Sequence, residues 1–190
     1  IAMLVYAAKG KINFEDLLKI YVKVNKEIEN NPDLNLKVFE LLNKLEKRNK
    51  EVINKFKNVV GTCINGQKKI LGELGIKYDI FDYESKYLFN KKTDKVLKEL
   101  EKTKKLFTDK DGRKIIDMDG YNLAMKMPLF VLTRGDDTSL YGLRDIAYTI
   151  EKMERCKDNI IVLGEEQKLY FQQIKIALEM LNKKAPRVVH

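Results

Sequence analysis

The chain has 190 residues, of which 44% are hydrophobic and 34% are charged, with three prolines. This length allows one hydrophobic core, or one core with an insertion, and the composition excludes a low-complexity or fibrous chain. The net charge is +9. It suits an anionic partner such as RNA, although the lysines are spread along the whole chain and do not identify that partner.

The cysteines and the hydropathy exclude several classes of protein. Cys63 and Cys156 lie far apart, with no second cysteine or histidine near either, so the sequence predicts neither a metal site nor a disulfide framework. We expect both to be reduced thiols of a cytoplasmic protein. No apolar run reaches about 18 residues and no signal-peptide pattern is present, so no membrane partner is expected.

Residues 1–74 have the apolar spacing of helices. The opening IAMLVYAA resembles the end of a buried helix, and Asn13 is positioned to cap the next one. The triplet Asn31-Pro32-Asp33 predicts a break. A second helix is expected to carry one apolar stripe made of Val38, Leu41, Leu42, Leu45, Val52 and Phe56.

Glycines punctuate the rest of this helical part. We expect Gly61 and Gly66 to interrupt the helix, and Gly75 to end the last one. The aromatic and β-branched bias of IKYDIFDYES (76–85) then predicts a strand. A lysine-rich helix is expected at about 92–105, followed by a hairpin in LFTDKDGRKIIDM with its turn at 110–112. Residues 75–128 therefore read as an α+β insertion.

Residues 129–190 read as an α/β unit. PLFVLTR and NIIVLG are predicted to be buried strands, LYGLRDIAYTIEKMERC and QKLYFQQIKIALEML helices, and RVVH the start of a third strand. Strand, helix, strand, helix, strand is half of a doubly wound, Rossmann-like parallel sheet. In such sheets, ligands bind beyond the carboxyl ends of the strands. The loops at that edge are RGDDTSLY and GEEQ.

Candidate binding residues lie at these two helix entries. Tyr141 and Asp145 are four apart, so on a helix they share one face and offer a phenol and a carboxylate to a cation such as guanidinium. The alternative is a helix start with a solvated ion pair between Arg144 and Asp145, which spacing alone favours. The amide of Gln167 suits an α-amino or carboxylate group, or simply begins a helix.

Other polar clusters also have two readings. Four loop acids could hold Mg²⁺ or act in acid–base chemistry, but solvated turns are the more probable reading: Asp136, Asp137, Glu165 and Glu166. Four tyrosines could stack on bases, but are more often core or half-buried residues: Tyr78, Tyr83, Tyr87 and Tyr170. The lysines at 91–105 could follow an RNA backbone or form a solvated helix face. We assign no catalytic residue and no metal ligand.

Four stretches together resemble one family. They are YVKVNKE, LGELGIKYDIFDYESKY, VLTRGDDTSLYGLRDIAYTIEK and NIIVLGEEQKLYFQQIKIALEML. They resemble the arginyl-tRNA synthetases, class I enzymes, in their archaeal or eukaryote-like form. The signature Tyr-x-x-Arg-Asp after an Asp-x-Thr turn is specific, because few other families place these residues in this order. The resemblance covers essentially the whole chain.

The resemblance implies a Rossmann catalytic domain that activates L-arginine with ATP and Mg²⁺ and esterifies the 3′ end of tRNA(Arg). Tyr141 and Asp145 match the family's positions that grip the arginine side chain, and Gln167 matches one that helps place its backbone end. The insertion would lie near the tRNA acceptor end. The family also implies a monomeric, cytoplasmic enzyme without a tightly bound cofactor.

The sequence also departs from the family's pattern. Asp137 stands where the family has glycine, and Thr149 where it often has histidine. The His-x-Gly-His and Lys-Met-Ser-Lys-Ser motifs are missing, and the chain starts and stops within expected core elements. We therefore expect a central fragment that is inactive alone. The alternatives are a non-catalytic, synthetase-like module that binds RNA or a partner, and an unrelated nucleotide-binding α/β domain.

Overall fold

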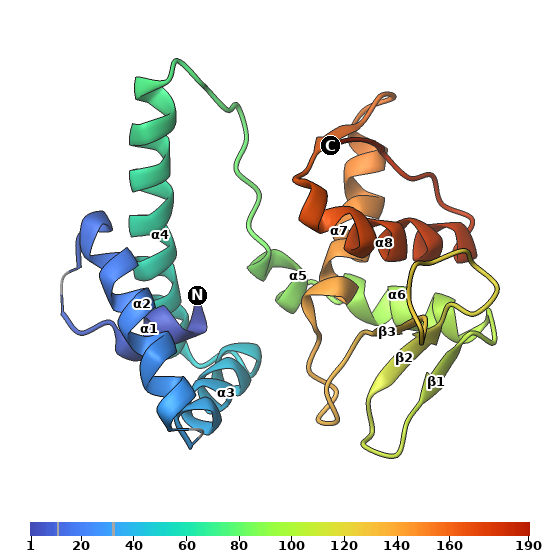
Figure 1. The fold of residues 1–190 in the computed structure, drawn as a ribbon, viewed down its shortest axis with the longest axis horizontal. Helices are drawn as coiled ribbons and strands as arrows, with labels where there is room; N and C mark the ends of the chain where they lie inside the picture. The colour runs from blue at the N-terminus through green and yellow to red at the C-terminus, as the bar shows by residue number, and fades with distance from the viewer. Residues whose placement is uncertain (11, 32) are drawn as a thin grey trace. The chain divides into compact units, whose positions relative to one another are not determined.

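The structure is a computed structural model that describes residues 1–10, 12–31 and 33–190. The chain forms two compact units, Ile1–Asp82 and Tyr83–His190, shown in Figure 1. Each is described by itself. No helix in the described ranges has the length and hydropathy needed to cross a lipid bilayer.

The first unit consists, in its described residues, of helices α1 (Ala2–Ala7), α2 (Phe14–Asn30), α3 (Asp33–Glu46) and α4 (Lys50–Glu73). The predicted cap is confirmed, because Asn13 Oδ1 accepts a hydrogen bond of 2.9 Å from the backbone N–H of Asp16. The predicted break is confirmed by the end of α2 and the start of α3, whereas Pro32 lies outside the described residues. The buried core of this unit is formed by Leu4, Val5, Leu17 and Val59.

Two expectations about the helices of this unit are wrong. The stripe from Val38 to Phe56 does not lie on one helix, because α3 ends at Glu46 and α4 begins at Lys50. Asn49 causes the restart: its side chain accepts a hydrogen bond of 3.1 Å from the backbone N–H of Val52 and so caps α4. Gly61 and Gly66 do not interrupt the chain either, since α4 runs through both. The predicted end of the last helix at Gly75 is confirmed, and Gly75 has a φ of +74°.

Gly66 has a packing role instead. A Cβ atom added at Gly66 would lie 2.0 Å from Cγ of Phe14, the first residue of α2. The missing side chain therefore lets the aromatic ring pack directly on the backbone of α4.

Residues 76–83 form no strand, which corrects the expectation for IKYDIFDYES. The aromatic residues there pack locally: Tyr78 contacts Phe81 with ring centroids 5.9 Å apart, and Lys68 Nζ lies 4.1 Å above the Phe81 ring.

The second unit begins with helices α5 (Ser85–Phe89) and α6 (Lys92–Glu101). Strands β1 (Leu106–Thr108), β2 (Lys114–Asp117) and β3 (Leu129–Val131) form an antiparallel sheet in that order. The predicted hairpin is confirmed, with Gly112 at a φ of +77° in its turn. The lysine-rich helix is also confirmed, although it ends four residues earlier than the expected 105.

The rest of this unit alternates helices and strands: α7 (Tyr141–Arg155), β4 (Ile160–Val162), the 3₁₀ turn η1 (Glu165–Gln167), α8 (Lys168–Met180) and β5 (Arg187–Val189). Strands β4 and β5 pair in parallel, as predicted. The pairing of β3 differs from the expectation, because β3 joins β2 and not the parallel pair. The proposed boundaries of the insertion, at 74/75 with the helical part and at 128/129 with the α/β unit, remain predictions.

One core unites the elements of the second unit. Ile116 of β2 and Phe130 of β3 are opposite each other and pack with Leu143 and Ile146 of α7 and Ile174 of α8. Strand β4 was predicted to be buried, but it is covered on one face only. Ile161 packs against the core, whereas Ile160 is 51% exposed and Val162 77% exposed. Within the described residues β4 pairs only with β5, which explains this exposure.

Glu151 on α7 ties three helices of this unit together. Its carboxylate accepts hydrogen bonds from Lys86 Nζ (2.5 Å), Lys92 Nζ (2.6 Å), the Tyr87 hydroxyl (2.9 Å) and Arg155 Nη2 (2.9 Å). Lys86 and Tyr87 belong to α5 and Lys92 to α6. The bonds from Lys86, Lys92 and Arg155 hold the pKa of the Glu151 carboxyl well below its ordinary value.

Gly66→Ala should destabilise the first unit. Alanine favours a helix by about 1 kcal/mol over glycine, but forcing a methyl group into the Phe14 ring costs about 1–3 kcal/mol. Gly61→Ala is the matched control, because no atom lies within 4 Å of a Cβ there. It should raise the free energy of unfolding by about 0.5–1 kcal/mol. Urea unfolding measures both. Equal gains in stability at the two sites would contradict the proposed contact.

Glu151→Gln should lower the free energy of unfolding by about 1–3 kcal/mol at neutral pH, because two lysines lose a charged partner. A carboxyl with a lowered pKa stabilises the fold above its ordinary pKa of 4.5 and loses that contribution below it. The difference from wild type should therefore shrink as the pH falls below 4.5. Glu154→Gln, at an exposed position of the same helix, is the control. A similar, pH-independent effect of both changes would rule out this role.

Candidate functional site

The loop between β3 and α7 is held in one shape by its own hydrogen bonds. Its backbone closes with Arg134 N–H donating to Thr138 O over 2.9 Å. Asp136 Oδ1 accepts from the Thr138 backbone N–H (3.1 Å) and hydroxyl (2.6 Å). Asp137 has a φ of +62°, the left-handed region that glycine prefers and aspartate tolerates. The departure from the family's glycine therefore keeps a conformation that suits glycine.

Tyr141 and Asp145 occupy the first and second turns of α7, as predicted. Asp145 is half-buried, and its Oδ2 accepts a hydrogen bond of 2.5 Å from the Tyr170 hydroxyl on α8. The rings of Tyr141 and Tyr170 lie 5.1 Å apart between centroids, and Tyr170 also packs edge-on against Phe130 at 6.0 Å. The structure therefore joins the two predicted residues through a third, Tyr170.

The sequence analysis did not assign Tyr170 to this site. From sequence, Tyr170 was expected either to stack on bases or to be a core or half-buried residue. The only available signal was its position on the first turn of α8, three residues after Gln167. Of the other three tyrosines, Tyr87 is buried in the core, whereas Tyr78 and Tyr83 are exposed.

The environment of Asp145 disfavours its negative charge. Burial raises the pKa of the Asp145 carboxyl; the Tyr170 hydrogen bond lowers this pKa, and the nearby Glu84 carboxylate raises it. Burial and the bond to Asp145 also raise the pKa of the Tyr170 phenol, so this group stays protonated and donates. Arg144 and Lys152 lie near enough to lower the pKa of Asp145, but within residues 1–10, 12–31 and 33–190 no cation forms an ion pair with it.

Arg144 does not form the solvated pair with Asp145 that spacing alone favours. Its Nε bonds Glu84 Oε1 at 2.5 Å, and its Nη1 donates to the Ser139 hydroxyl at 3.0 Å and to the Ser139 carbonyl oxygen. The Arg144 side chain is only 15% exposed. It therefore fastens the β3–α7 loop and the start of α5 to α7, and it brings Glu84 near Asp145. Glu84 is the second residue that the sequence analysis did not assign to the site.

Gln167 lies at the other predicted helix entry. It is the last residue of η1 and its side chain is exposed. In the described part of the chain, no hydrogen bond connects its amide to Tyr141 or Asp145. The structure places Gln167 just beyond the carboxyl end of β4, one turn before Tyr170. Its side chain is available to a ligand.

The loop acids do not converge. Asp136 bonds Thr138, the Asp137 carboxylate lies 3.5 Å from Lys114 Nζ, and Glu165 lies 3.5 Å from Lys168 Nζ. Among the described residues, no three histidine, cysteine, aspartate or glutamate side chains are grouped to hold a metal ion. The other departure from the family, Thr149, is 2% exposed. It therefore belongs to the packing of α7.

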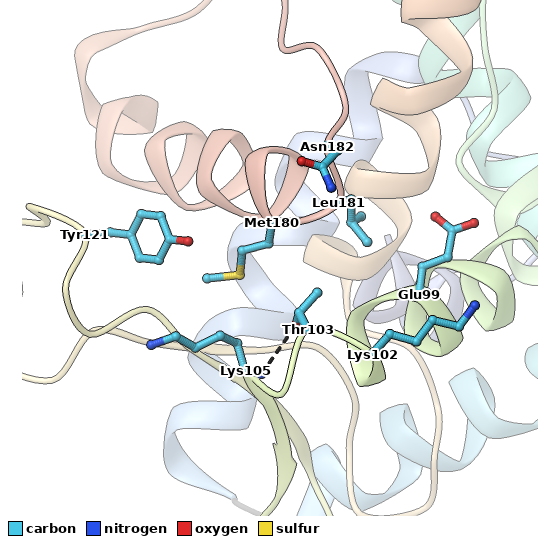
Figure 2. Close-up of a pocket in the computed structure, with 8 residues that line it drawn as sticks. All are labelled: Glu99, Lys102, Thr103, Lys105, Tyr121, Met180, Leu181 and Asn182. Atoms are coloured by element: carbon cyan, nitrogen blue, oxygen red, sulfur yellow. Dashed lines mark hydrogen bonds between the residues drawn. The ribbon is translucent and has the colours of Figure 1, made fainter.

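A separate cavity of about 590 Å³ lies between the ends of α6 and α8 (Figure 2). Met180 and Tyr121 line one part of it, and Thr103, Lys105 and Asn182 others. Its lining includes neither Asp145 nor its partners. The candidate site is therefore the surface around Asp145, at the start of α7.

Comparison with known proteins identifies the family. The family model described as "tRNA synthetases class I (R), catalytic domain" matches residues 5–190. Arginine–tRNA ligase of Methanocaldococcus jannaschii is 36% identical over 186 residues, which are 95% of this chain and 32% of that protein. The enzyme of the same name from Methanocella arvoryzae is 38% identical over 175 residues, 92% of this chain and 29% of that protein. The chain thus spans about a third of these relatives' length.

Solved structures agree on the fold. Arginyl-tRNA synthetase of Thermus thermophilus matches with a TM-score of 0.70 at 18% identity, over 99% of this chain and 39% of that one. The Plasmodium falciparum enzyme matches with a TM-score of 0.71 at 16% identity, over 98% of this chain and 32% of that one. The fold is α/β with a parallel pair of strands, as in these neighbours. On the family match and the identity to its relatives, the chain belongs to the class I arginyl-tRNA synthetases and is part of their catalytic domain.

Proposed function

We propose that this chain binds L-arginine and acts, in the protein that carries it, in the ATP-dependent attachment of arginine to tRNA(Arg). The observation that supports this most is the half-buried Asp145 carboxylate, held by Tyr170 beside Tyr141 and in no ion pair with a described residue. The relatives' name, arginine–tRNA ligase, agrees with such a site. A cytoplasmic, monomeric protein is part of the same proposal.

The arginine side chain would be selected by its planar guanidinium group. Tyr170 occupies Oδ2 of Asp145, which leaves Oδ1 to accept hydrogen bonds from the guanidinium. Glu84 adds a second negative charge nearby, and Tyr141 covers the site with an exposed phenol. A lysine ammonium carries the charge but not the planar fork of donors, so it would bind more weakly. Gln167 would hold the α-amino or carboxylate end.

The residues of the site around Asp145 act on arginine and not on the phosphates of ATP. In the proposed reaction the arginine carboxylate attacks the α-phosphate of ATP and pyrophosphate leaves. A ribose hydroxyl of tRNA then attacks the carbonyl carbon of the arginyl adenylate, and AMP leaves. The His-x-Gly-His and Lys-Met-Ser-Lys-Ser motifs that stabilise phosphate charge in class I enzymes do not occur in these 190 residues. The loop acids are engaged elsewhere and do not fit as a magnesium site. We therefore assign no step to a metal here.

A non-catalytic binding module is the second candidate, and its basis was the departures at Asp137 and Thr149. Asp137 adopts the φ of +62° that the family's glycine would favour, and Thr149 is buried. Neither position makes a hydrogen bond to Asp145 or Tyr170. These observations favour the arginine-binding function.

Asp145→Asn should raise the arginine KM in ATP–pyrophosphate exchange by about 30-fold or more, because a buried charged partner of the guanidinium is lost. Exchange is measured on the full-length protein that carries this chain, with tRNA(Arg) present. Since burial raises the pKa of Asp145, the neutral variant should be at least as stable as wild type at neutral pH. Glu154→Gln, exposed on the same helix, is the control. An unchanged KM and an unchanged preference for arginine over lysine would refute the assignment.

Tyr170→Phe tests the proposed support of Asp145. The Tyr170 hydrogen bond lowers the pKa of Asp145, so its loss should raise that pKa. Arginine binding requires the ionised carboxylate. The acidic limb of the plot of kcat/KM for arginine against pH should therefore move to higher pH, with a loss of about 3- to 10-fold at neutral pH from one missing hydrogen bond. A variant with a lower kcat but an unmoved limb would show that Tyr170 acts on packing alone.

A further inference from the structure

A basic cavity lies at the end of α7 opposite to the arginine site. It has a volume of about 700 Å³ and is lined by Met153, Lys157, Asp158, Asn159, Ile160, Lys184, Ala185 and Arg187. These residues come from the last turn of α7, the turn that leads into β4 and the first residue of β4, and from the segment 184–187 that enters β5. Since α7 has 15 residues, about 22 Å of helix separates Tyr141 from this end.

The backbone around the cavity is fixed by the parallel strands. Ile160 and Arg187 are partners in the β4–β5 register, and the Arg187 backbone N–H donates to Asn159 O over 2.9 Å. The Asn159 side chain donates to the Lys152 carbonyl at the end of α7 over 3.1 Å. The two segments that carry the cations are therefore held next to each other.

The charges of this cavity are not balanced. Lys157, Lys184 and Arg187 face one acid, Asp158, and none of the three cations forms an ion pair within the described ranges 1–10, 12–31 and 33–190. Arg155, close by in sequence, is in contrast bound to Glu151 at 2.9 Å. Like charges gathered in a concave surface produce a positive potential that attracts anions.

We propose that this cavity binds the phosphate backbone of tRNA, at a place separate from the site around Asp145. The inference rests on the proposed function for the identity of the RNA. The guanidinium of Arg187 presents a fork of donors to phosphate oxygens, while Lys157 and Lys184 act as point charges. All three side chains are exposed, and the Asn159 amide is already engaged. A small free anion would need enclosed donors, whereas a polyanion binds exposed cations through counterion release.

Binding of a tRNA(Arg) transcript to the protein, measured as a function of salt, tests the proposal. The triple variant Lys157→Gln, Lys184→Gln, Arg187→Gln removes three phosphate contacts. The slope of log K against log salt should become shallower by about 0.7–0.9 for each contact. From about 50 to about 200 mM salt, the ratio of wild-type to variant affinity should therefore fall by about 20- to 40-fold.

The matched control is the triple variant Lys19→Gln, Lys23→Gln, Lys26→Gln, which removes the same charge from exposed positions of α2. It should keep the wild-type slope. Equal slopes in the two variants, or a wild-type slope in the cavity variant, would overturn the proposal. Weaker binding of inorganic phosphate in the cavity variant with an unchanged tRNA slope would assign the cavity to a free anion, and would overturn it too.

An arginine titration of the same variants separates this inference from the proposed function. The cavity variant should bind arginine as wild type does, because its three positions lie at the far end of α7. Loss of arginine binding together with the tRNA slope would indicate a general defect and would overturn the proposal. Failure of Asp145→Asn to affect arginine binding would refute the arginine site, while the salt slopes would still decide whether the cavity binds RNA.

Discussion

The hydrogen bond from Tyr170 to Asp145 is the interaction on which the candidate site depends, because it joins α8 to α7 and fixes the carboxylate. A second carboxylate of the same helix, Glu151, provides the comparison. Cations surround Glu151 and lower its pKa, whereas Asp145 has a phenol as its donor and burial raises its pKa. Two acids six positions apart thus have opposite electrostatic roles. One stabilises the packing of the helices, and the other is a half-buried carboxyl that forms no ion pair with a described residue.

The elements of the second unit could be predicted from sequence because their patterns are local. The apolar runs of β4 and β5, the helical spacing of α7 and α8, and the turn at Gly112 each fit within a short window. The errors came from tertiary effects. Helix α4 runs through Gly66, where the absent side chain leaves room for the Phe14 ring, and residues 76–83 have strand-like composition but form no strand. The pairing of β3 with β2 is likewise a long-range choice.

The same distinction applies to the site. The spacing of Tyr141 and Asp145 on one helix is a local property, and it was predicted correctly as a shared face. Tyr170 lies 25 residues after Asp145, and Glu84 lies 60 residues before Arg144, so no local pattern could reveal these contacts. The alternative of a solvated Arg144–Asp145 pair, which spacing alone favours, is wrong for this reason. At 18% identity to the Thermus enzyme the chain keeps the family's fold, which depends on such long-range packing more than on residue identity.

The net charge of the chain and the exposed apolar side chains of β4 and β5 respond differently to ionic strength. Ile160, Val162 and Val189 are 51%, 77% and 44% exposed, so the outer face of the parallel pair carries three apolar side chains beside the exposed Arg187. At low salt the net charge of +9 keeps copies of the chain apart by mutual repulsion. Salt screens that repulsion but leaves the hydrophobic attraction between apolar faces intact. The colloidal stability of the chain therefore declines as the salt concentration rises.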